Sequence, residues 1–170
     1  MKSIIITIVT MLSICAHADA HQIAFDLIAK NEGFRSNVYT CTAGKKTIGY
    51  GFTSARIVAK NYISKAEADK VLNDYIDQCM RVVHQLDIKV KLTDNQKAVL
   101  CDMVYHFGSG AIMNAKDLLS AINSGNANNV KTQLMRWNKQ RVRGKDGKVT
   151  FKVVAGLTNR QSRLAQLWDK

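Results

Sequence analysis

The spacing of apolar residues along the chain predicts a mainly helical protein. Six segments repeat apolar residues at the interval of one helix face: residues 22–31, 64–83, 93–107, 118–122, 130–137 and 158–168. Three of them open on a capping box, in which Ser or Thr is followed three positions later by Glu or Gln: Ser64, Thr93 and Thr158. The segment 98–107 is apolar on nearly every side, so we expect it to lie in the middle of the core.

Two stretches interrupt the helical pattern. Four glycines occur in residues 33–56, and residues 47–53 alternate in polarity with the period of a strand. Gly44 marks a turn, so this region predicts a small β-hairpin. Residues 138–153 are polar and basic with two more glycines, which predicts a loop or a second hairpin. The expected fold is therefore α+β but mainly helical, with a small N-terminal β-hairpin lobe and a larger helical lobe.

The first twenty residues have the pattern of an export signal. Met1 and Lys2 precede an apolar run over residues 4–15, and an Ala-x-Ala site ends at Ala20. We therefore expect residues 1–20 to be a signal peptide and residues 21–170 to form one domain. Two other interpretations stay open: an uncleaved anchor, which would give transient membrane contact, and a buried N-terminal helix. Either form of export takes the protein to the periplasm of the host bacterium or outside the cell.

The charge of the chain narrows the class of partner. Lys and Arg number 25 against 13 Asp and Glu, a net charge of +12, which favours polyanions such as nucleic acid, anionic lipid or the bacterial envelope. The export signal argues against nucleic acid. One basic stretch is either a solvated face or an edge that contacts the cell wall: Lys139, Arg141, Arg143, Lys145, Lys148 and Lys152.

The four cysteines, Cys15, Cys41, Cys79 and Cys101, have no spacing typical of a zinc site, so we expect neither a metal nor a cofactor. Export would allow disulfides to form. Cys79 and Cys101 fall on core-facing positions of neighbouring predicted helices. They either form a disulfide, which would leave Cys41 outside the pair, or pack there as thiols.

Glu32 stands where the first predicted helix ends and the glycine-rich hairpin begins. The negative end of the helix dipole disfavours its ionised form, so we expect a raised pKa, as a general acid requires. Eight residues separate Glu32 from Cys41 and five separate Cys41 from Thr47, after which come Gly49 and Gly51. This spacing resembles the active-site motif of the phage-type lysozymes, or endolysins, of glycoside hydrolase family 24. The resemblance covers residues 22–168 and includes an Arg-Trp segment at 136–137 and a closing segment at 154–168.

The resemblance implies a lysozyme-like fold and an enzyme that hydrolyses the β-1,4 bond between N-acetylmuramic acid and N-acetylglucosamine in peptidoglycan. It implies that Glu32 donates the proton to the leaving sugar oxygen. Cys41 occupies the second catalytic position, where many relatives have Asp, and Thr47 would help to hold the attacking water. Arg160 resembles the arginine that packs beside the catalytic glutamate.

Several of these residues have more than one interpretation. Tyr105 and Trp137 either line the substrate cleft or belong to the core. Cys41 either acts on the water, as a thiolate or by polarising it, or is a small buried residue. His84 and His106 are expected to be structural, since neither has a second metal ligand at helical spacing.

Two other functions compete with hydrolysis. A lytic transglycosylase needs only one acid/base glutamate, because the substrate's own hydroxyl replaces water, and the Cys in place of Asp fits that chemistry. From a different class, the chain could be a cationic protein that binds the envelope without catalysis. In each case we expect a monomer that acts on the peptidoglycan or the envelope of a bacterium and binds no nucleic acid.

Overall fold

A computed structural model describes residues 20–41, 44–143 and 148–170. In chain order its elements are a helix over residues 20–32, then β1 (Arg35–Thr40), β2 (Lys46–Gly49), α2 (Ala55–Val58), α3 (Lys65–Gln85), α4 (Asp94–Phe107), α5 (Ser109–Met113), α6 (Lys116–Asn123), α7 (Ala127–Met135), β3 (Lys139–Arg143), β4 (Val149–Val153) and α8 (Ala155–Trp168). Apart from Ala20, the expected leader lies outside the described residues, as do Cys15 and Lys145.

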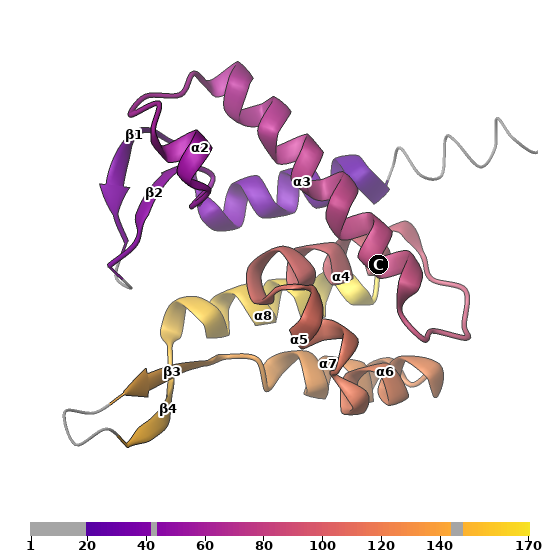
Figure 1. Ribbon diagram of the computed structural model, residues 1–170. Coiled ribbons are helices and arrows are strands. Elements are labelled where there is room, and N and C mark those ends of the chain that lie inside the picture. Colours follow the sequence, from indigo (N-terminus) through magenta and orange to yellow (C-terminus); the bar gives the residue numbers. More distant parts are fainter. Residues whose placement is uncertain (1–19, 42–43, 144–147) are drawn as a thin grey trace, which may run out of the picture.

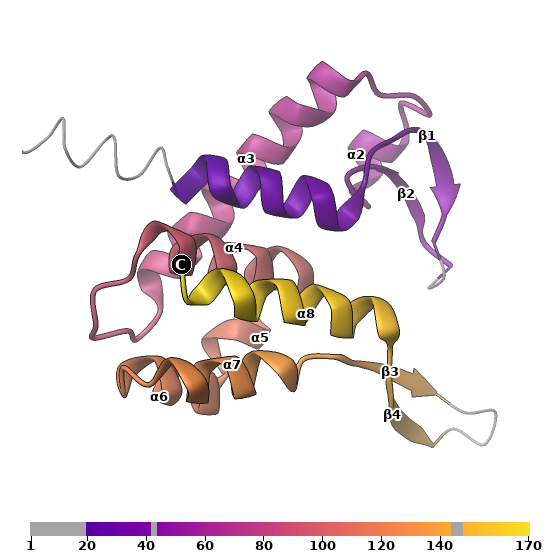
Figure 2. The same cartoon turned by 180° about the vertical axis from the view of Figure 1, so that it is seen from behind.

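The elements form two lobes joined by α3. In Figure 1, β1, β2 and α2 lie at one end of the molecule, α4 to α8 form the body below, and α3 runs diagonally between them. Figure 2 shows from behind that the helix over residues 20–32 lies above α4 and α8. The expected α+β fold, mainly helical with a small N-terminal hairpin lobe, is confirmed.

The N-terminal lobe is built on the predicted hairpin. Strands β1 and β2 pair antiparallel, with Tyr39 opposite Thr47. Ile48 and Phe52 then exchange two backbone hydrogen bonds of 3.0 and 2.9 Å, which close a tight turn after β2. Gly49 is required in this turn, because its φ is +65° and an added Cβ would lie 2.6 Å from the Phe52 ring.

Two of the three predicted capping boxes begin helices. The Ser64 hydroxyl accepts a 3.2 Å bond from the first turn of α3, and Thr93 and Gln96 cap α4 reciprocally. The prediction for Thr158 is wrong, because α8 already begins at Ala155. Thr158 lies inside the first turn of α8, where its hydroxyl donates to the Val154 carbonyl instead of capping an amide.

Helix α4 forms the centre of the core, as its sequence predicts. Every residue from Ala98 to Val104 is buried, because α3 and α8 pack against it. The largest fully buried side chains come from both lobes: Ile28, Ile48, Ile63, Leu72, Ile76, Met80, Leu100, Met103, Ile112, Leu118, Ile122 and Leu134. This shared core fixes the ends of the first helix, α4 and α8 relative to one another.

The basic stretch forms a second hairpin. Strands β3 and β4 pair antiparallel, with Lys139 opposite Val153 and Arg141 opposite Phe151, and the hairpin extends away from the body (Figure 1). Phe151 and Val153 are 67% and 62% exposed. Among the described residues, no helix has the length and apolar character needed to span a membrane.

Candidate active site

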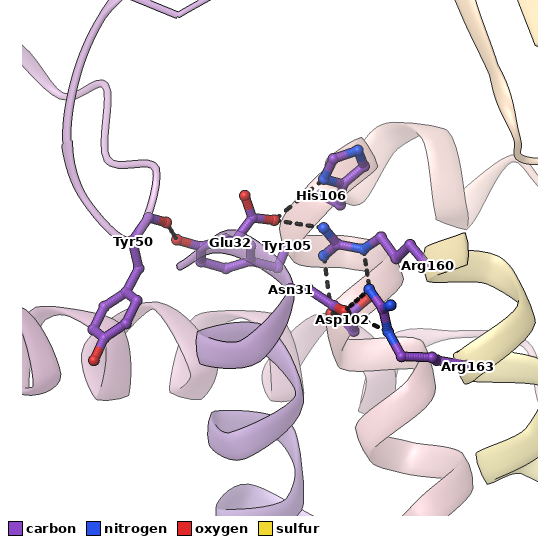
Figure 3. Close-up of polar contacts among 8 residues, drawn as sticks. All are labelled: Asn31, Glu32, Tyr50, Asp102, Tyr105, His106, Arg160 and Arg163. Atoms are coloured by element: carbon purple, nitrogen blue, oxygen red, sulfur yellow. Dashed lines mark hydrogen bonds and ion pairs between the residues drawn. The ribbon is translucent and has the colours of Figure 1, made fainter. Parts of the chain in front are cut away.

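Glu32 lies at the end of the first helix, where three elements meet. The helix ends because Gly33 adopts a φ of +68°, while the Gly33 amide still donates a 3.0 Å bond to the Ala29 carbonyl. Oε1 of Glu32 accepts a 2.6 Å bond from Nη1 of Arg160 on α8 and lies 3.3 Å from Nδ1 of His106 on α4 (Figure 3). The Glu32 side chain is 19% exposed, so it is shielded but still reachable from solvent.

A buried ion pair fixes the arginine that holds Glu32. Asp102 of α4 is fully buried and accepts two bonds of 2.9 Å from Nε and Nη2 of Arg160. Burial alone would lower the pKa of Arg160, but the charges of Asp102 and Glu32 raise it, so the guanidinium stays charged. Asn31 donates a 3.0 Å bond to Asp102 and accepts two bonds from Arg163 (Figure 3). The arginine beside Glu32 is therefore oriented by a continuous polar network.

This environment reverses the expected shift in the pKa of Glu32. Burial is the largest single effect and raises the pKa. The hydrogen bond with His106 and the charge and hydrogen bond of Arg160 together hold it below its ordinary value. The expectation of a raised pKa is therefore wrong. A helix end carries only about half a unit charge, whereas Arg160 brings a full positive charge to 2.6 Å.

Tyr105 links α4 to the turn that follows β2. Its hydroxyl donates a 2.7 Å bond to the Tyr50 carbonyl, and burial raises its pKa (Figure 3). Gly51, which follows Tyr50 in the chain, has a φ of +86°, and a Cβ added to it would lie 3.3 Å from Oε2 of Glu32. Tyr105 and Gly51 also line a cavity of about 330 Å³ between the lobes. Tyr105 thus lies at the edge of the core and of the interlobe cavity together.

Cys41 and Thr47 meet at the turn of the first hairpin. The Cys41 amide donates a 2.9 Å bond to the Lys45 carbonyl, and the Thr47 hydroxyl donates a 3.0 Å bond to the same oxygen. Thr47 is buried, whereas Cys41 is half-buried just beyond β1. The motif therefore places these two residues together on the hairpin, while the contacts of Glu32 described above run to α4 and α8.

Cys79 of α3 and Cys101 of α4 are buried thiols in contact. A hydrogen bond between the two side chains lowers the pKa of Cys79 and raises that of Cys101. The Cys101 thiol also lies 3.9 Å from the Ile76 carbonyl. In this structure both cysteines are thiols, which matches the prediction that they pack in the core without a disulfide. Within the described residues, no group of three or more His, Cys, Asp and Glu side chains could hold a metal.

One cavity lies beside Glu32, and a second adjoins it. The first, of about 530 Å³, is lined by Glu32, His106 and Arg160 and by Lys139 and Arg141 of β3. The second, of about 600 Å³, shares Lys139 and Arg141. Trp137 lines the second cavity and packs on Phe107, with 4.9 Å between ring centroids. It is half-buried, so it contributes both to packing and to the cavity wall.

Asp102, His106 and Asn31 belong to the site but were not expected from the sequence. The sequence predicts a structural role for His106, yet it contacts Glu32 directly. One signal was present: Asp102 is the one charged residue inside the apolar run of α4, and a buried charge requires a partner. His106 follows it by four positions, hence on the same helix face.

Comparison with known proteins identifies the family of the chain. Residues 29–163 match the Phage lysozyme family model. The chain is 34% identical over 119 residues to an endolysin of Acyrthosiphon pisum secondary endosymbiont phage 1, which covers 70% of this chain and 80% of that protein. It is 32% identical to an endolysin of Bacillus phage B103 over 69% of this chain, but spans only 45% of that relative.

A solved structure gives the same result at the level of the fold. An endolysin from Escherichia coli O157:H7 phage FAHEc1 superposes with a TM-score of 0.74 at 25% identity, covering 86% of this chain and 90% of that one. The family match spans most of the chain and includes Glu32, Cys41, Thr47, His106 and Arg160. The chain therefore belongs to the phage lysozyme family.

Proposed function

We propose that this protein is a lysozyme that hydrolyses the β-1,4 bond between N-acetylmuramic acid and N-acetylglucosamine in peptidoglycan. The observation that carries the proposal is a single carboxylate, Glu32, held at a cavity by a buried Arg160–Asp102 pair in a chain of this family. Such a pair fixes the position of the carboxyl group without covering it, as a proton donor to a leaving oxygen requires.

Glu32 acts as the general acid in this proposal. Arg160 stabilises the carboxylate form of Glu32. The pKa of Glu32 must therefore rise when the substrate binds, so that the group carries a proton to donate. Burial is already the largest effect that raises this pKa, and a saccharide that displaces water from the cavity increases it. The ion pair keeps the carboxyl group oriented while its proton affinity changes.

Cys41 and Thr47 supply the water-activating half of the mechanism. An inverting hydrolase needs a group on the far side of the sugar to position or deprotonate the attacking water. The Thr47 hydroxyl is anchored to the Lys45 carbonyl, and the Cys41 amide shares that anchor, which supports a common role. Cys41→Ala should lower the rate strongly and Cys41→Asp should retain or restore it; an alanine variant with the wild-type rate contradicts this role.

The proton-donor role is tested on purified peptidoglycan by counting new reducing ends. Glu32→Gln should lower the rate about 10²–10⁴-fold, which is the usual contribution of a general acid. Glu67→Gln is the matched control. Glu67 lies in the first turn of α3, where it pairs with Lys60, so this variant should change the rate little. Anhydro ends instead of reducing ends would indicate transglycosylation. Lysis that survives Glu32→Gln would exclude an enzymatic mechanism.

The cationic edge beside the catalytic cavity holds the enzyme on its anionic substrate. Lys139 and Arg141 line the cavity that contains Glu32 and the cavity that adjoins it, so bound peptidoglycan would pass them. The double variant Lys139→Gln/Arg141→Gln should cosediment less with peptidoglycan at low salt. The matched control is Lys89→Gln/Lys91→Gln, which removes the same charge from two exposed residues between α3 and α4 and should weaken binding less. If the two double variants lose the same amount of binding, the attraction comes from net charge and not from this edge.

The protein acts outside the cytoplasm, as a monomer, in the periplasm of the host bacterium or beyond it. Support comes from the leader pattern in residues 1–20 and from a substrate that lies outside the cytoplasmic membrane. The mass of the exported protein, with and without reductant, distinguishes a cleaved leader from an uncleaved anchor and counts the disulfides. Sedimentation velocity tests the monomer.

A further inference from the structure

His106 is a histidine side chain in direct contact with Glu32. Its Nδ1 atom lies 3.3 Å from Oε1 of Glu32, and its other ring nitrogen points away from the glutamate (Figure 3). The His106 side chain is 29% exposed, compared with 19% for Glu32 and 5% for Arg160. The ring stands nearly perpendicular to that of Phe107, at 82° and 4.7 Å between centroids, which supports its orientation.

The charged groups that line the same cavity as His106 are mostly cations. Arg160 and Arg163 approach from α8, and Lys139 and Arg141 from β3; all four line the same cavity. On α4 itself, Asp102 is engaged by Arg160. Lysine and arginine keep their charge between pH 5 and 8, whereas histidine changes charge there. A change in the field at Glu32 across this range therefore comes from His106.

We propose that His106 is a positioning residue that regulates the proton of Glu32: its charged form holds Glu32 ionised, and its neutral form releases it. This rests on the proposed role of Glu32 as proton donor. When the ring is charged, both of its nitrogens carry protons, and Nδ1 donates a hydrogen bond to the ionised Oε1 of Glu32. When the ring is neutral, the positive charge beside Glu32 is gone, so the carboxyl group of Glu32 binds a proton more readily and can pass it to the leaving sugar oxygen.

The test compares initial rates of peptidoglycan hydrolysis at low substrate for wild type and His106→Gln between pH 8 and 5.5. The ratio of variant to wild type should rise as the pH falls, by up to about tenfold, since a coupling of one pKa unit is tenfold in proton affinity. His106→Lys, a permanent cation, should be slower than His106→Gln at pH 8. His84→Gln, on the surface of α3, should give a ratio that does not change with pH. A constant ratio for His106→Gln, or equal rates for the glutamine and lysine variants at pH 8, would overturn the proposal.

A second measurement does not depend on activity. The pKa of Glu32, followed by carbon-13 NMR of labelled glutamate carboxyl groups, should be higher in His106→Gln than in wild type. An unchanged pKa refutes the role of His106 even if peptidoglycan is hydrolysed. A raised pKa in a protein that produces no Glu32-dependent cleavage refutes the proposed function instead, so the two failures are distinguishable.

Discussion

Removal of Asp102 is the sharpest test of how the site is held together. Asp102→Ala deletes both 2.9 Å bonds to Arg160 and leaves a guanidinium with 5% exposure opposite a small cavity. Glu32 is then the remaining anionic partner described for Arg160. The variant thus converts a paired buried charge into a partly uncompensated one.

Removing one partner of a buried ion pair costs about 3–5 kcal/mol of unfolding free energy. In a domain of this size each kcal/mol corresponds to roughly 2–4 °C, so the midpoint of thermal unfolding should fall by about 6–20 °C. The matched control is Asp117→Ala. Asp117 pairs with Arg136 at 3.1 Å, but their side chains are 71% and 63% exposed. That pair should contribute about 0–1 kcal/mol.

Urea unfolding followed by circular dichroism at pH 7 gives both free energies, and hydrolysis rates show whether Glu32 is displaced. The double variant Asp102→Ala/Arg160→Met should be less destabilised than the sum of the single variants, since the stranded charge is gone. If the destabilisation by Asp102→Ala lies within about 1 kcal/mol of that by Asp117→Ala, the buried pair does not hold the site together.

Three further changes test the neighbouring contacts. Gly51→Ala should cost about 1–3 kcal/mol because of its positive φ, and should lower kcat, since the new Cβ lies 3.3 Å from Oε2 of Glu32; unfolding and rate measurements check both. Tyr105→Phe should cost about 0.5–1.5 kcal/mol by removing the bond to the Tyr50 carbonyl, and an unchanged midpoint would contradict this. The folded-state pKa of Glu32 is depressed, so its stabilising contribution is present above the ordinary value of 4.5 and is lost as the pH falls through the folded value. Wild type should therefore lose stability relative to Glu32→Gln in acid, and parallel urea-unfolding curves against pH would contradict it.

Local patterns in the sequence predicted most of the fold. The apolar residues of α4 located the central helix, and the alternation in residues 47–53 located the first hairpin. Ser64 and Thr93 marked true helix starts, because a capping box satisfies amides that no other group nearby can reach. Thr158 has the same pattern, but the chain is already helical when it leaves β4. There the arrangement of the preceding strand overrode the local signal.

The site divides in the same way. The sequence alone placed Glu32 at the end of the first helix, whereas the grouping of Glu32 with Cys41 and Thr47 came from the spacing of a family motif. Arg160, like Cys41 and Thr47, was assigned through the family resemblance. The packing of that helix, α4 and α8 decided the rest.

That packing joins Glu32 to His106 across 74 positions and to Arg160 across 128, and places Asn31 on Asp102 across 71. These contacts determine the pKa of the acid. The negative helix end predicted a raised value, whereas full charges from distant elements lower it. A charge acts through distance in space, so only the tertiary structure could give the direction of that shift.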